Sequence, residues 1–356
     1  MKILFTGGGS YGHVTPIVSV YPKLKSDGVF TEFYWIGSAK FEEQAAQELD
    51  IAYIGIKTAK VRRYMSWKNV TDMFVLFASL FRTLSVLRKI KPDLIFSTGG
   101  YVSVPVVLIG KMLGIKIVIH EQTVSFGLAN KVGARVAKRI LLSDAASLSY
   151  LTQSQKNKAI VVGNPINQKL LIPSNLKDFF TFADTHKKLL YITGGSQGSQ
   201  KINQVIFEVL RELCSTYNVI HQCGVLDYEK AQEYMKTYEG SYIARDFIGN
   251  QMAAIYQHAH IVISRSGAST VNVLGVFAVP TVFVPLQPCN NDEQYKNAMK
   301  FLQTNTGTIV KQDELSKDTL LHALQKVESS VGVEKRVVQG NDAVVEIVKS
   351  LEGVVR

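Results

Sequence analysis

The sequence predicts an α/β fold with two similar domains, each a parallel sheet covered by helices on both faces. Three observations lead to this prediction. Strand-like apolar runs alternate with helical stretches, the alternation restarts after residues 172–186, and a glycine-rich turn follows the first strand of each half. The chain has 356 residues, of which 46% are hydrophobic, so it can form two cores of ordinary size.

The first half opens with MKILFTG, an apolar run that ends in glycine and is typical of a buried parallel strand. A helix is expected from about residue 14 to residue 25. Further strands are expected at residues 30–37, 93–100, 115–122, 139–143 and 159–165. Strands separated in this way by helical stretches favour a parallel sheet.

The second half repeats the pattern, with strands starting at residue 187 and within 260–270 and 280–286. We therefore expect an N-terminal domain over residues 1–165 and a linker over 166–186. A C-terminal domain is expected over 187–340. A C-terminal helix is expected over 341–356, and its return to the first domain is one possible arrangement.

Positive charge is concentrated in the first half. Residues 1–165 contain 21 Lys and Arg against 10 Asp and Glu, whereas residues 166–356 contain 19 of each kind. A one-sided basic surface indicates an anionic partner, either nucleic acid or lipid. The sequence has no zinc-finger spacing, RNP-type aromatic motif or basic helical repeat. We therefore expect an anionic membrane surface and no nucleic acid.

The N-terminal sequence predicts no signal peptide, and the spacing of the cysteines predicts no disulfide or metal chemistry. MKILFTGGG begins directly with a strand, so no signal peptide is expected. No apolar run reaches the roughly 18 residues that span a bilayer. Cys214, Cys223 and Cys289 have no C-x-x-C or metal-ligand spacing, which is typical of reduced thiols.

The first glycine loop allows two interpretations. Gly7, Gly9 and Gly12 fit G-x-G-x-x-G, the pattern of a dinucleotide-binding turn. That fold needs an acidic residue after the second strand to bond the ribose, but Glu32 lies near the start of that strand. We therefore reject the NAD or flavin interpretation. A second glycine loop at residues 194–198 favours two loops that grip an activated sugar across a cleft.

Several motifs, in order along nearly the whole chain, resemble the GT-B glycosyltransferases and, within them, the MurG family. They are GGGSYGH, STGGYVSVP, HEQTVSFGLANK, VVGNPI, GGSQGSQKIN, DFIGNQMAAIYQHAHIVISRSGAST and EQYKNA. The resemblance implies two Rossmann-like domains facing a cleft. The N-terminal domain would face the acceptor and the membrane, and the C-terminal domain would bind the UDP-sugar. It also implies inverting transfer of N-acetylglucosamine from UDP-N-acetylglucosamine to the muramoyl 4-hydroxyl of lipid I. The product would be lipid II for peptidoglycan synthesis, made at the cytoplasmic face of the cell membrane by a peripheral enzyme.

The resemblance also implies a donor site. Its residues would be Ser10, Tyr11, Gly12, Ser196, Ile248, Ala268, Ser269, Thr270 and Gln294. Ser196 would bond a phosphate, Ile248 would pair with the uracil edge through its backbone, and Gln294 would contact the sugar hydroxyls.

His13 is the candidate catalytic base, because histidine titrates near neutrality and His13 follows a glycine turn at a helix start. The alternative is that His13 orients the acceptor, with His120 or Glu121 as the base. Glu121 and Asn130 are the expected acceptor-binding residues. No D-x-D occurs, so we expect no metal cofactor, with helix dipoles and hydroxyls stabilising the departing UDP. The H-x-H pair, His258 and His260, is not expected to bind metal.

Four positions depart from the family pattern. Val273 replaces a glutamate that bonds ribose in family members, Asn167 replaces an arginine, Thr123 an asparagine and Glu293 a glutamine. Two alternatives follow from these changes: another UDP-sugar-dependent glycolipid transferase, or a weakened non-catalytic paralogue that binds a sugar nucleotide. A sugar-nucleotide epimerase is disfavoured by the basic first domain.

Residues 67–89 predict an amphipathic helix. Its apolar positions are Val70, Met73, Phe74, Phe77, Leu80, Phe81, Leu84 and Leu87. Basic residues around it are Lys57, Lys60, Arg62, Arg63, Lys68, Arg82, Arg88, Lys89 and Lys91. Two interpretations stay open: a buried helix with a solvated basic rim, or a patch that dips into an anionic leaflet.

Overall fold

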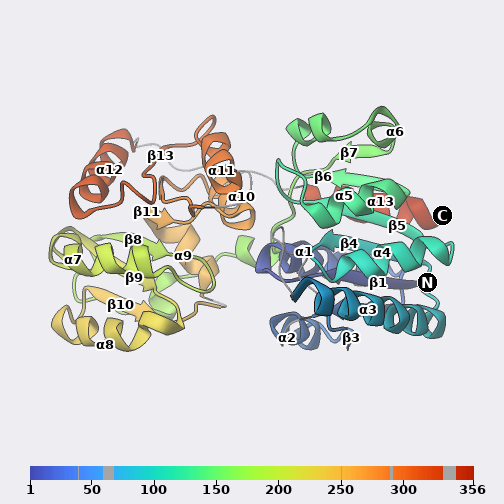
Figure 1. The fold of residues 1–356 in the computed structure, drawn as a ribbon. Helices are drawn as coiled ribbons and strands as arrows, with labels where there is room; N and C mark the ends of the chain where they lie inside the picture. Colours follow the sequence, from blue (N-terminus) through green and yellow to red (C-terminus); the bar gives the residue numbers. More distant parts are fainter. Residues whose placement is uncertain (39, 59–67, 250, 289–291, 332–341) are drawn as a thin grey trace. The chain divides into compact units, whose positions relative to one another are not determined.

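The computed structural model describes all residues except 39, 59–67, 250, 289–291 and 332–341, and it leaves out the side chains of residues 11, 40, 68–74 and 76. The chain forms two compact units (Figure 1). Unit 1 contains Met1–Asn167 and Asn341–Arg356, and unit 2 contains Gln168–Gly340.

Unit 1 is built on a seven-stranded sheet with the order β3-β2-β1-β4-β5-β6-β7, and all neighbouring strands are parallel. The strands are β1 (Lys2–Gly7), β2 (Glu32–Gly37), β3 (Ala52–Gly55), β4 (Leu94–Gly99), β5 (Lys116–Glu121), β6 (Arg139–Leu142) and β7 (Ala159–Val161). The helices are α1 (Tyr11–Asp27), α2 (Lys40–Glu48), α3 (Lys68–Ile90), α4 (Ser103–Met112), α5 (Leu128–Val136), α6 (Gln153–Lys156) and α13 (Ala343–Val355), with a 3-10 turn η1 (Ala145–Tyr150).

Alternate residues of the unit 1 strands pack into two separate hydrophobic cores, one on each face of the sheet. Ile3 and Phe5 of β1 pack with α1, α2 and α13 on one face, while Leu4 packs with α3, α4 and α5 on the other. This follows from the two-residue period of a strand, and it explains why the strands read as continuous apolar runs. Helix α13 thus belongs to unit 1, where Val348 and Leu351 are buried against the sheet.

Unit 2 is built on a six-stranded parallel sheet with the order β10-β9-β8-β11-β12-β13. The strands are β8 (Lys188–Thr193), β9 (Tyr217–Gln222), β10 (Tyr242–Arg245), β11 (Ala259–Ser264), β12 (Thr281–Phe283) and β13 (Gly307–Ile309). The helices are α7 (Gln200–Thr216), α8 (Tyr228–Thr237), α9 (Met252–His258), α10 (Ala268–Val276), α11 (Glu293–Phe301) and α12 (Lys317–Ser330), with 3-10 turns η2 (Gln168–Leu171), η3 (Leu176–Asp178) and η4 (Val225–Asp227). The predicted α/β class, with two parallel sheets, is confirmed.

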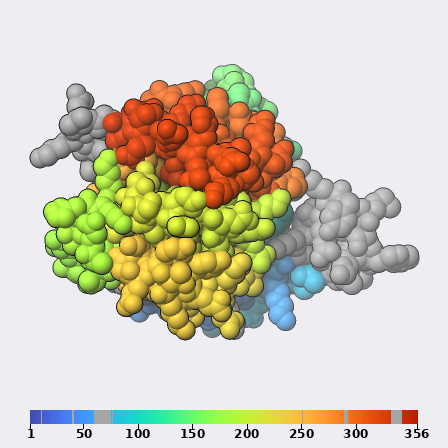
Figure 2. All heavy atoms as spheres, turned by 90° about the vertical axis from the view of Figure 1, so that its left-hand side faces the viewer, coloured from blue at the N-terminus to red at the C-terminus, as the bar shows by residue number. Residues whose placement is uncertain are grey.

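Helices α7, α8 and α12 cover one face of the unit 2 sheet through a single apolar cluster. The space-filling view shows α12 in orange-red above the yellow and yellow-green residues of this layer (Figure 2). Aromatic pairs hold the other face, including Tyr191 with Tyr256 of α9 and Phe283 with Phe301 of α11. The segment after residue 167 is bound to α9, because the amide of Gln257 donates to two of its backbone oxygens at 2.9 and 2.8 Å.

Both sheets reverse their strand order next to their first strand. In unit 1, β1 and β4 are neighbours from which α1 and α4 leave toward opposite faces. In unit 2, β8 and β11 are the equivalent pair, followed by α7 and α10. Ligands of open α/β sheets bind outside the carboxyl ends of strands at such a switch point. Both glycine loops lie there.

Candidate functional site

His13 stands at the switch point of unit 1, in the first turn of α1. The loop before it runs from Gly7 to Ser10, and Tyr11 and Gly12 share its helical turn. The backbone of Gly99, at the end of β4, comes so close that a Cβ atom there would lie 3.2 Å from Cε1 of His13. Glycine is required at this position both by that approach and by its φ of +94°.

The hydrogen bonds of His13 fix which nitrogen carries the proton. Its Nδ1 lies 2.7 Å from the backbone oxygen of Thr98 and 3.2 Å from Oε1 of Gln122. The amide of Gln122 is oriented by its Nε2, which donates to the backbone oxygens of Thr98 and His120 at 2.8 and 3.0 Å. Both partners of Nδ1 are therefore acceptors, so Nδ1 carries the hydrogen. In the neutral ring, Nε2 then holds the lone pair that can accept a proton.

Glu121 and Asn130 are buried beside each other, and Asn130 lies close to Gly99. The carboxylate of Glu121 accepts hydrogen bonds of 2.9 to 3.1 Å from Thr123, the backbone of Gly127 and Nδ2 of Asn130. The amide of Asn130 lies next to the backbone of Gly99. Its Oδ1 has no hydrogen-bond partner among the residues that the structure describes. A buried acceptor of this kind is suited to a hydroxyl of a ligand.

His120 is fully buried, and its Nε2 lies 3.0 Å from the backbone oxygen of Gly163. Burial lowers the pKa of His120 to about 4. The neutral ring donates its Nε2 hydrogen to this carbonyl. His120 therefore links β5 to the turn after β7. Since the side chain has no surface accessible to solvent, it cannot receive a proton from a substrate.

The second glycine loop lies at the switch point of unit 2. Ser196 is partly exposed in this loop. Ser199 caps α7 by accepting a hydrogen bond from the backbone of Ile202 at 3.5 Å. Residues 268–270 form the first turn of α10, which follows β11. Two helix N-termini thus lie at the carboxyl ends of neighbouring strands, and such N-termini favour anions.

A buried cation lies below this loop. Arg265 is 8% exposed, and its Nη2 donates to Oγ of Ser199 and Oε1 of Gln312, both at 2.7 Å. Its Nη1 donates to the backbone oxygen of Val284 at 2.9 Å. Burial lowers the pKa of Arg265 to about 10, which leaves it charged at neutral pH. Since these partners are neutral, its charge adds to the positive potential of the loop.

Gln222 connects the second glycine loop to Ile248, the residue expected to pair with uracil. Its Nε2 donates to the backbone oxygen of Gly195 at 2.8 Å, and its Oε1 accepts the backbone N–H of Ile248 at 3.0 Å. The backbone N–H of Ile248 is thus already bonded to Gln222. Its backbone carbonyl is therefore the group expected to pair with the edge of the uracil ring. Phe247, beside it, is 48% exposed. Neither Gln222 nor Gln122 was predicted from the sequence, although Gln222 ends a buried strand and Gln122 directly follows one.

Helix α11 carries the expected residue Gln294 and a second polar residue, Asn297. Oε1 of Gln294 accepts a hydrogen bond from the backbone N–H of Leu286 at 2.9 Å. The side-chain nitrogen of Gln294 is then the group that can donate to a ligand. Asn297 is buried and donates to the backbone oxygen of Ser266 at 3.1 Å, so it anchors α11 to the turn before α10.

The departures from the family pattern fall in different environments. Val273 is 7% exposed, inside α10. Thr123 has its hydroxyl bonded to Glu121. Glu293 begins α11 and is partly exposed, and Asn167 ends the first segment of unit 1.

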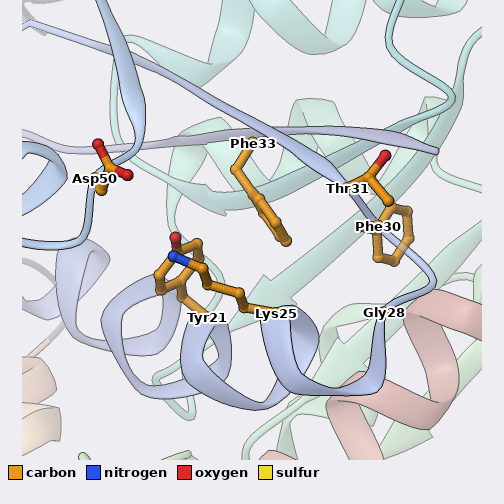
Figure 3. Close-up of a pocket in the computed structure, with 7 residues that line it drawn as sticks. All are labelled: Tyr21, Lys25, Gly28, Phe30, Thr31, Phe33 and Asp50. Carbon is orange, nitrogen blue, oxygen red and sulfur yellow. The ribbon is translucent and has the colours of Figure 1, made fainter.

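A pocket in unit 1 lies near the amino ends of its strands, at the opposite end of the sheet from His13 (Figure 3). It is lined by Tyr21, Lys25, Gly28, Phe30, Thr31, Phe33 and Asp50. In the close-up, the ring of Phe33 points between Tyr21 and Phe30. Most of the lining precedes β2 or β3, at the amino ends of the strands. Ligands of parallel sheets bind at the carboxyl ends, so this pocket is separate from the candidate site.

No group of three or more His, Cys, Asp or Glu side chains that could hold a metal ion occurs among the described residues. His258 bonds to a backbone oxygen of its own helix, and His260 bonds to a carboxylate of α12, both at 2.8 Å. Cys214 and Cys223 are free buried thiols, and burial raises their pKa to about 11. Cys289 lies outside the described residues.

The predicted amphipathic helix corresponds to α3, which packs beside α4 (Figure 1). Large apolar side chains are exposed on both helices: Phe77 (55%), Phe81 (72%), Leu108 (40%) and Met112 (61%). The basic side chains Arg82, Arg88, Lys89 and Lys111 are also exposed. The side chains of residues 59–74, which include part of the expected patch, are outside the description. Within the described part of the chain, no helix is long and apolar enough to cross a bilayer.

Comparison with known proteins gives consistent similarities. Residues 3–142 match the glycosyltransferase family 28 N-terminal domain, and residues 189–340 match the family's C-terminal domain. A Lachnospira eligens protein is 36% identical over 330 residues, covering 92% of this chain and 90% of that protein. It is named UDP-N-acetylglucosamine--N-acetylmuramyl-(pentapeptide) pyrophosphoryl-undecaprenol N-acetylglucosamine transferase. A protein of the same name from Lachnoclostridium phytofermentans is 34% identical over 361 residues, covering 99% of each chain.

Solved structures share the fold. The crystal structure of Acinetobacter baumannii MurG has a TM-score of 0.73 at 24% identity and covers 99% of both chains. The UDP-GlcNAc 2-epimerase of Neisseria meningitidis, bound to UDP-GlcNAc, has a TM-score of 0.66 at 15% identity and also covers 99% of both. Transferases and epimerases therefore share this architecture, and the fold alone does not separate their reactions.

Proposed function

The chain belongs to glycosyltransferase family 28, within the group of UDP-N-acetylglucosamine-dependent transferases that its motifs resemble, and on this premise we propose a specific reaction. The protein transfers N-acetylglucosamine from UDP-N-acetylglucosamine to the muramoyl 4-hydroxyl of lipid I, which gives lipid II for peptidoglycan. The observation that carries the proposal is the arrangement at the two switch points. At the first, the Nδ1–H of His13 bonds to Thr98, which leaves the lone pair of the neutral ring on Nε2. At the second, the loop next to the buried cation Arg265 is suited to a diphosphate.

His13 acts as the base in this proposal. Its Nε2 takes the proton from the acceptor hydroxyl, whose oxygen forms a bond to the anomeric carbon as the bond from that carbon to the UDP oxygen breaks. The hydrogen bond from Nδ1 to Thr98 supports this role, because it holds the neutral ring in the tautomer that the step requires. His120 is less suited, since it is fully buried and bonded to Gly163. Glu121 and Asn130 would face the acceptor, with the unpaired Oδ1 of Asn130 accepting a hydroxyl.

Unit 2 would bind the donor. Ser196 lies in the loop before α7 and residues 268–270 form the first turn of α10, where they can bond phosphate oxygens. Arg265 adds a buried positive charge next to them. The carbonyl of Ile248 would face the uracil edge, and the amide of Gln294 the sugar. Ser10, Tyr11 and Gly12 are further proposed contacts of the donor. These groups stabilise the negative charge on departing UDP, so the proposed reaction uses no metal cofactor.

The test is UDP release from UDP-N-acetylglucosamine, with and without a lipid I analogue and in the presence of EDTA. Release that depends on the acceptor and persists in EDTA supports the proposal. Release without the acceptor would indicate a hydrolase or epimerase-like reaction instead. UDP binding without release would indicate a non-catalytic paralogue, and loss of activity in EDTA would overturn the metal-free step.

The exposed residues of α3 and α4 are the proposed contact with the membrane. Apolar side chains beside exposed basic ones suit insertion into an anionic leaflet, with the protein bound peripherally at its cytoplasmic face. A lipid-anchored acceptor would then reach unit 1 from the bilayer surface. The excess of 11 positive charges in residues 1–165 supports this orientation.

A further inference from the structure

The side chain of Gln312 links the two parts of unit 2 that are proposed to hold the donor. Gln312 follows β13 and is 8% exposed. Its Oε1 accepts a hydrogen bond of 2.7 Å from Nη2 of Arg265, the buried cation next to the second glycine loop. Its Nε2 donates to the backbone oxygen of Gln287, in the segment that follows β12. Arg265 can only donate and a backbone oxygen can only accept, so the two partners fix the orientation of the amide.

Gln287 is bonded to Gln312 twice. Oε1 of Gln287 accepts the backbone N–H of Gln312 at 3.1 Å, while its backbone oxygen accepts the side-chain N–H. Each glutamine therefore offers its side chain to the backbone of the other. A single hydrogen bond would leave the segment after β12 free to turn about it, whereas two directional bonds restrain both its position and its rotation. Gln287 itself is only partly buried, so its side chain can be changed with little disturbance of the core.

The segment held in this way also holds the residue expected to contact the donor sugar. The backbone N–H of Leu286, directly before Gln287, donates to Oε1 of Gln294 at 2.9 Å. This bond leaves the side-chain nitrogen of Gln294 as the group that can donate to a sugar hydroxyl. The place of that nitrogen depends on the N–H of Leu286, and therefore on the bonds between Gln287 and Gln312.

Arg265 is held at the phosphate part of the site by other partners as well. Its Nη2 also donates at 2.7 Å to Oγ of Ser199, which caps α7 directly after the second glycine loop. Its Nη1 donates to the backbone oxygen of Val284 at 2.9 Å. A change of the Gln287 side chain touches none of these contacts and leaves the bond from Arg265 to Gln312 in place. The phosphate part and the sugar part can therefore be separated by mutation.

We propose that Gln312 is a positioning residue that couples the phosphate part of the donor site to its sugar part. It acts on the sugar through Gln287, Leu286 and Gln294, and on the phosphates through Arg265. The inference rests on the proposed function, because it takes UDP-N-acetylglucosamine as the donor and Gln294 as a contact of its sugar. It adds that the affinity contributed by the sugar depends on two glutamines that the proposed function places on neither the sugar nor the phosphates. UDP alone carries no sugar, so its binding should not depend on the bonds between them.

The experiment measures the dissociation constants of UDP and of UDP-N-acetylglucosamine by calorimetry and takes their ratio. Gln287→Leu removes the side-chain acceptor for the backbone N–H of Gln312. We expect this variant to bind UDP-N-acetylglucosamine about three- to tenfold more weakly, as one misplaced hydrogen bond to the sugar would cause, and to bind UDP as the wild-type protein does. Gln287→Glu keeps an acceptor oxygen there, so it should keep the wild-type ratio even where its added charge weakens both ligands. Gln303→Leu, at an exposed position after α11, is the control and should change neither constant.

The ratio separates positioning from simple stability. A structural brace would affect both ligands alike, so equal weakening of UDP and UDP-N-acetylglucosamine in Gln287→Leu overturns the proposal, and so do two unchanged constants. Gln312→Leu removes both side-chain bonds of Gln312 and should shift the ratio in the same direction. A folded Gln312→Leu protein with the wild-type ratio also overturns the proposal. If a melting curve shows that Gln312→Leu does not fold, Gln287→Leu decides the question.

Transfer to a lipid I analogue is measured on the same wild-type sample, so that the two proposals can fail separately. A wild-type protein that binds UDP-N-acetylglucosamine without transferring its sugar disproves the proposed reaction, while the ratio still decides the coupling. A wild-type protein that transfers the sugar, with a ratio that Gln287→Leu leaves unchanged, disproves the coupling alone. A wild-type protein that binds neither ligand overturns both.

Discussion

His13 and Thr98 exchange two hydrogen bonds: the imidazole Nδ1 lies 2.7 Å from the backbone oxygen of Thr98, and the hydroxyl of Thr98 donates to the backbone oxygen of His13 at 2.5 Å. This pair joins the start of α1 to the end of β4. The side-chain ring therefore cannot turn without breaking a bond, and its Nε2 faces one direction. Pre-organisation of this kind lowers the cost of reaching the reactive geometry.

The first prediction concerns this ring. We expect His13→Ala to lower kcat by about 10² to 10⁴ because the base is removed, and to leave UDP affinity unchanged because the donor loop lies in unit 2. Turnover with a lipid I analogue and calorimetry of UDP binding measure the two effects. Near-normal turnover would remove His13 from the reaction.

The second prediction uses two glutamines at matching places. Gln222 holds Gly195 and Ile248 of the donor site, whereas Gln122 holds His13. We expect Gln222→Leu to weaken UDP binding by about tenfold, since a buried N–H and carbonyl each lose a partner. Gln122→Leu should lower kcat and keep UDP affinity. If both variants have the same effect, the assignment of separate roles to the two units is wrong.

The third prediction concerns the membrane. Phe77→Glu combined with Phe81→Glu should abolish binding to anionic liposomes, because both exposed rings would be replaced by charges that the leaflet repels. Leu226→Glu in unit 2 is the matched control, since Leu226 is also strongly exposed at 77%. Cosedimentation at low and high salt measures binding. Equal loss in the control would assign the effect to net charge rather than to this patch.

The fourth prediction concerns Val273. From the family pattern alone, Val273→Glu should restore a contact to ribose and tighten UDP binding about tenfold. Val273 is only 7% exposed, so we expect a buried unpaired carboxylate to cost about 1–3 kcal/mol of stability without a gain in affinity. Melting curves and UDP calorimetry test this, with Asn272→Asp on the partly exposed side of α10 as the control. Tighter binding at unchanged stability would contradict it.

The fifth prediction concerns acid. Burial lowers the pKa of His120 to about 4 and that of His221 to about 3, from the ordinary histidine value of 6.5. The unfolded chain therefore binds more protons below pH 6.5, and the free energy of unfolding should fall as pH drops from 6.5 toward 4. Each histidine adds a slope of at most about 1.4 kcal/mol per pH unit.

Urea unfolding at several pH values measures that slope. His221→Asn should reduce it, because one buried imidazole is removed, whereas His186→Gln, at an exposed position, should leave it unchanged. An unfolding free energy that does not vary between about pH 7 and pH 5 would contradict the argument from burial.

Strands β1, β4 and β8 were predictable because each is a long apolar run followed by glycine. Strands β3 and β13 were missed because they are short edge strands with partly exposed side chains. Strand β9 was missed because it follows α7 with no intervening turn: Thr216 ends the helix and Tyr217 begins the strand. Local sequence signals mark turns, so a boundary without a turn leaves little trace.

At the site, His13 and the second glycine loop were identified from motif position, and their roles remain predictions. The supporting side chains were not found, because their partners are distant in sequence. Arg265, for example, reaches Ser199 across 66 residues. Such contacts depend on the strand order, which the pattern of strands and helices does not specify by itself.

The return of α13 to unit 1 has a consequence for how the protein is made. All of unit 2 separates this helix from the rest of its own core, so a ribosome completes residues 1–330 before α13 exists. Until then the face of the sheet that α13 covers, including Val118 and Leu141, has apolar surface exposed to water. Unit 2 has its whole sequence available earlier and can fold first. The half of the protein that begins synthesis is therefore the half that finishes folding last, and a truncation at the C-terminus would damage the N-terminal unit.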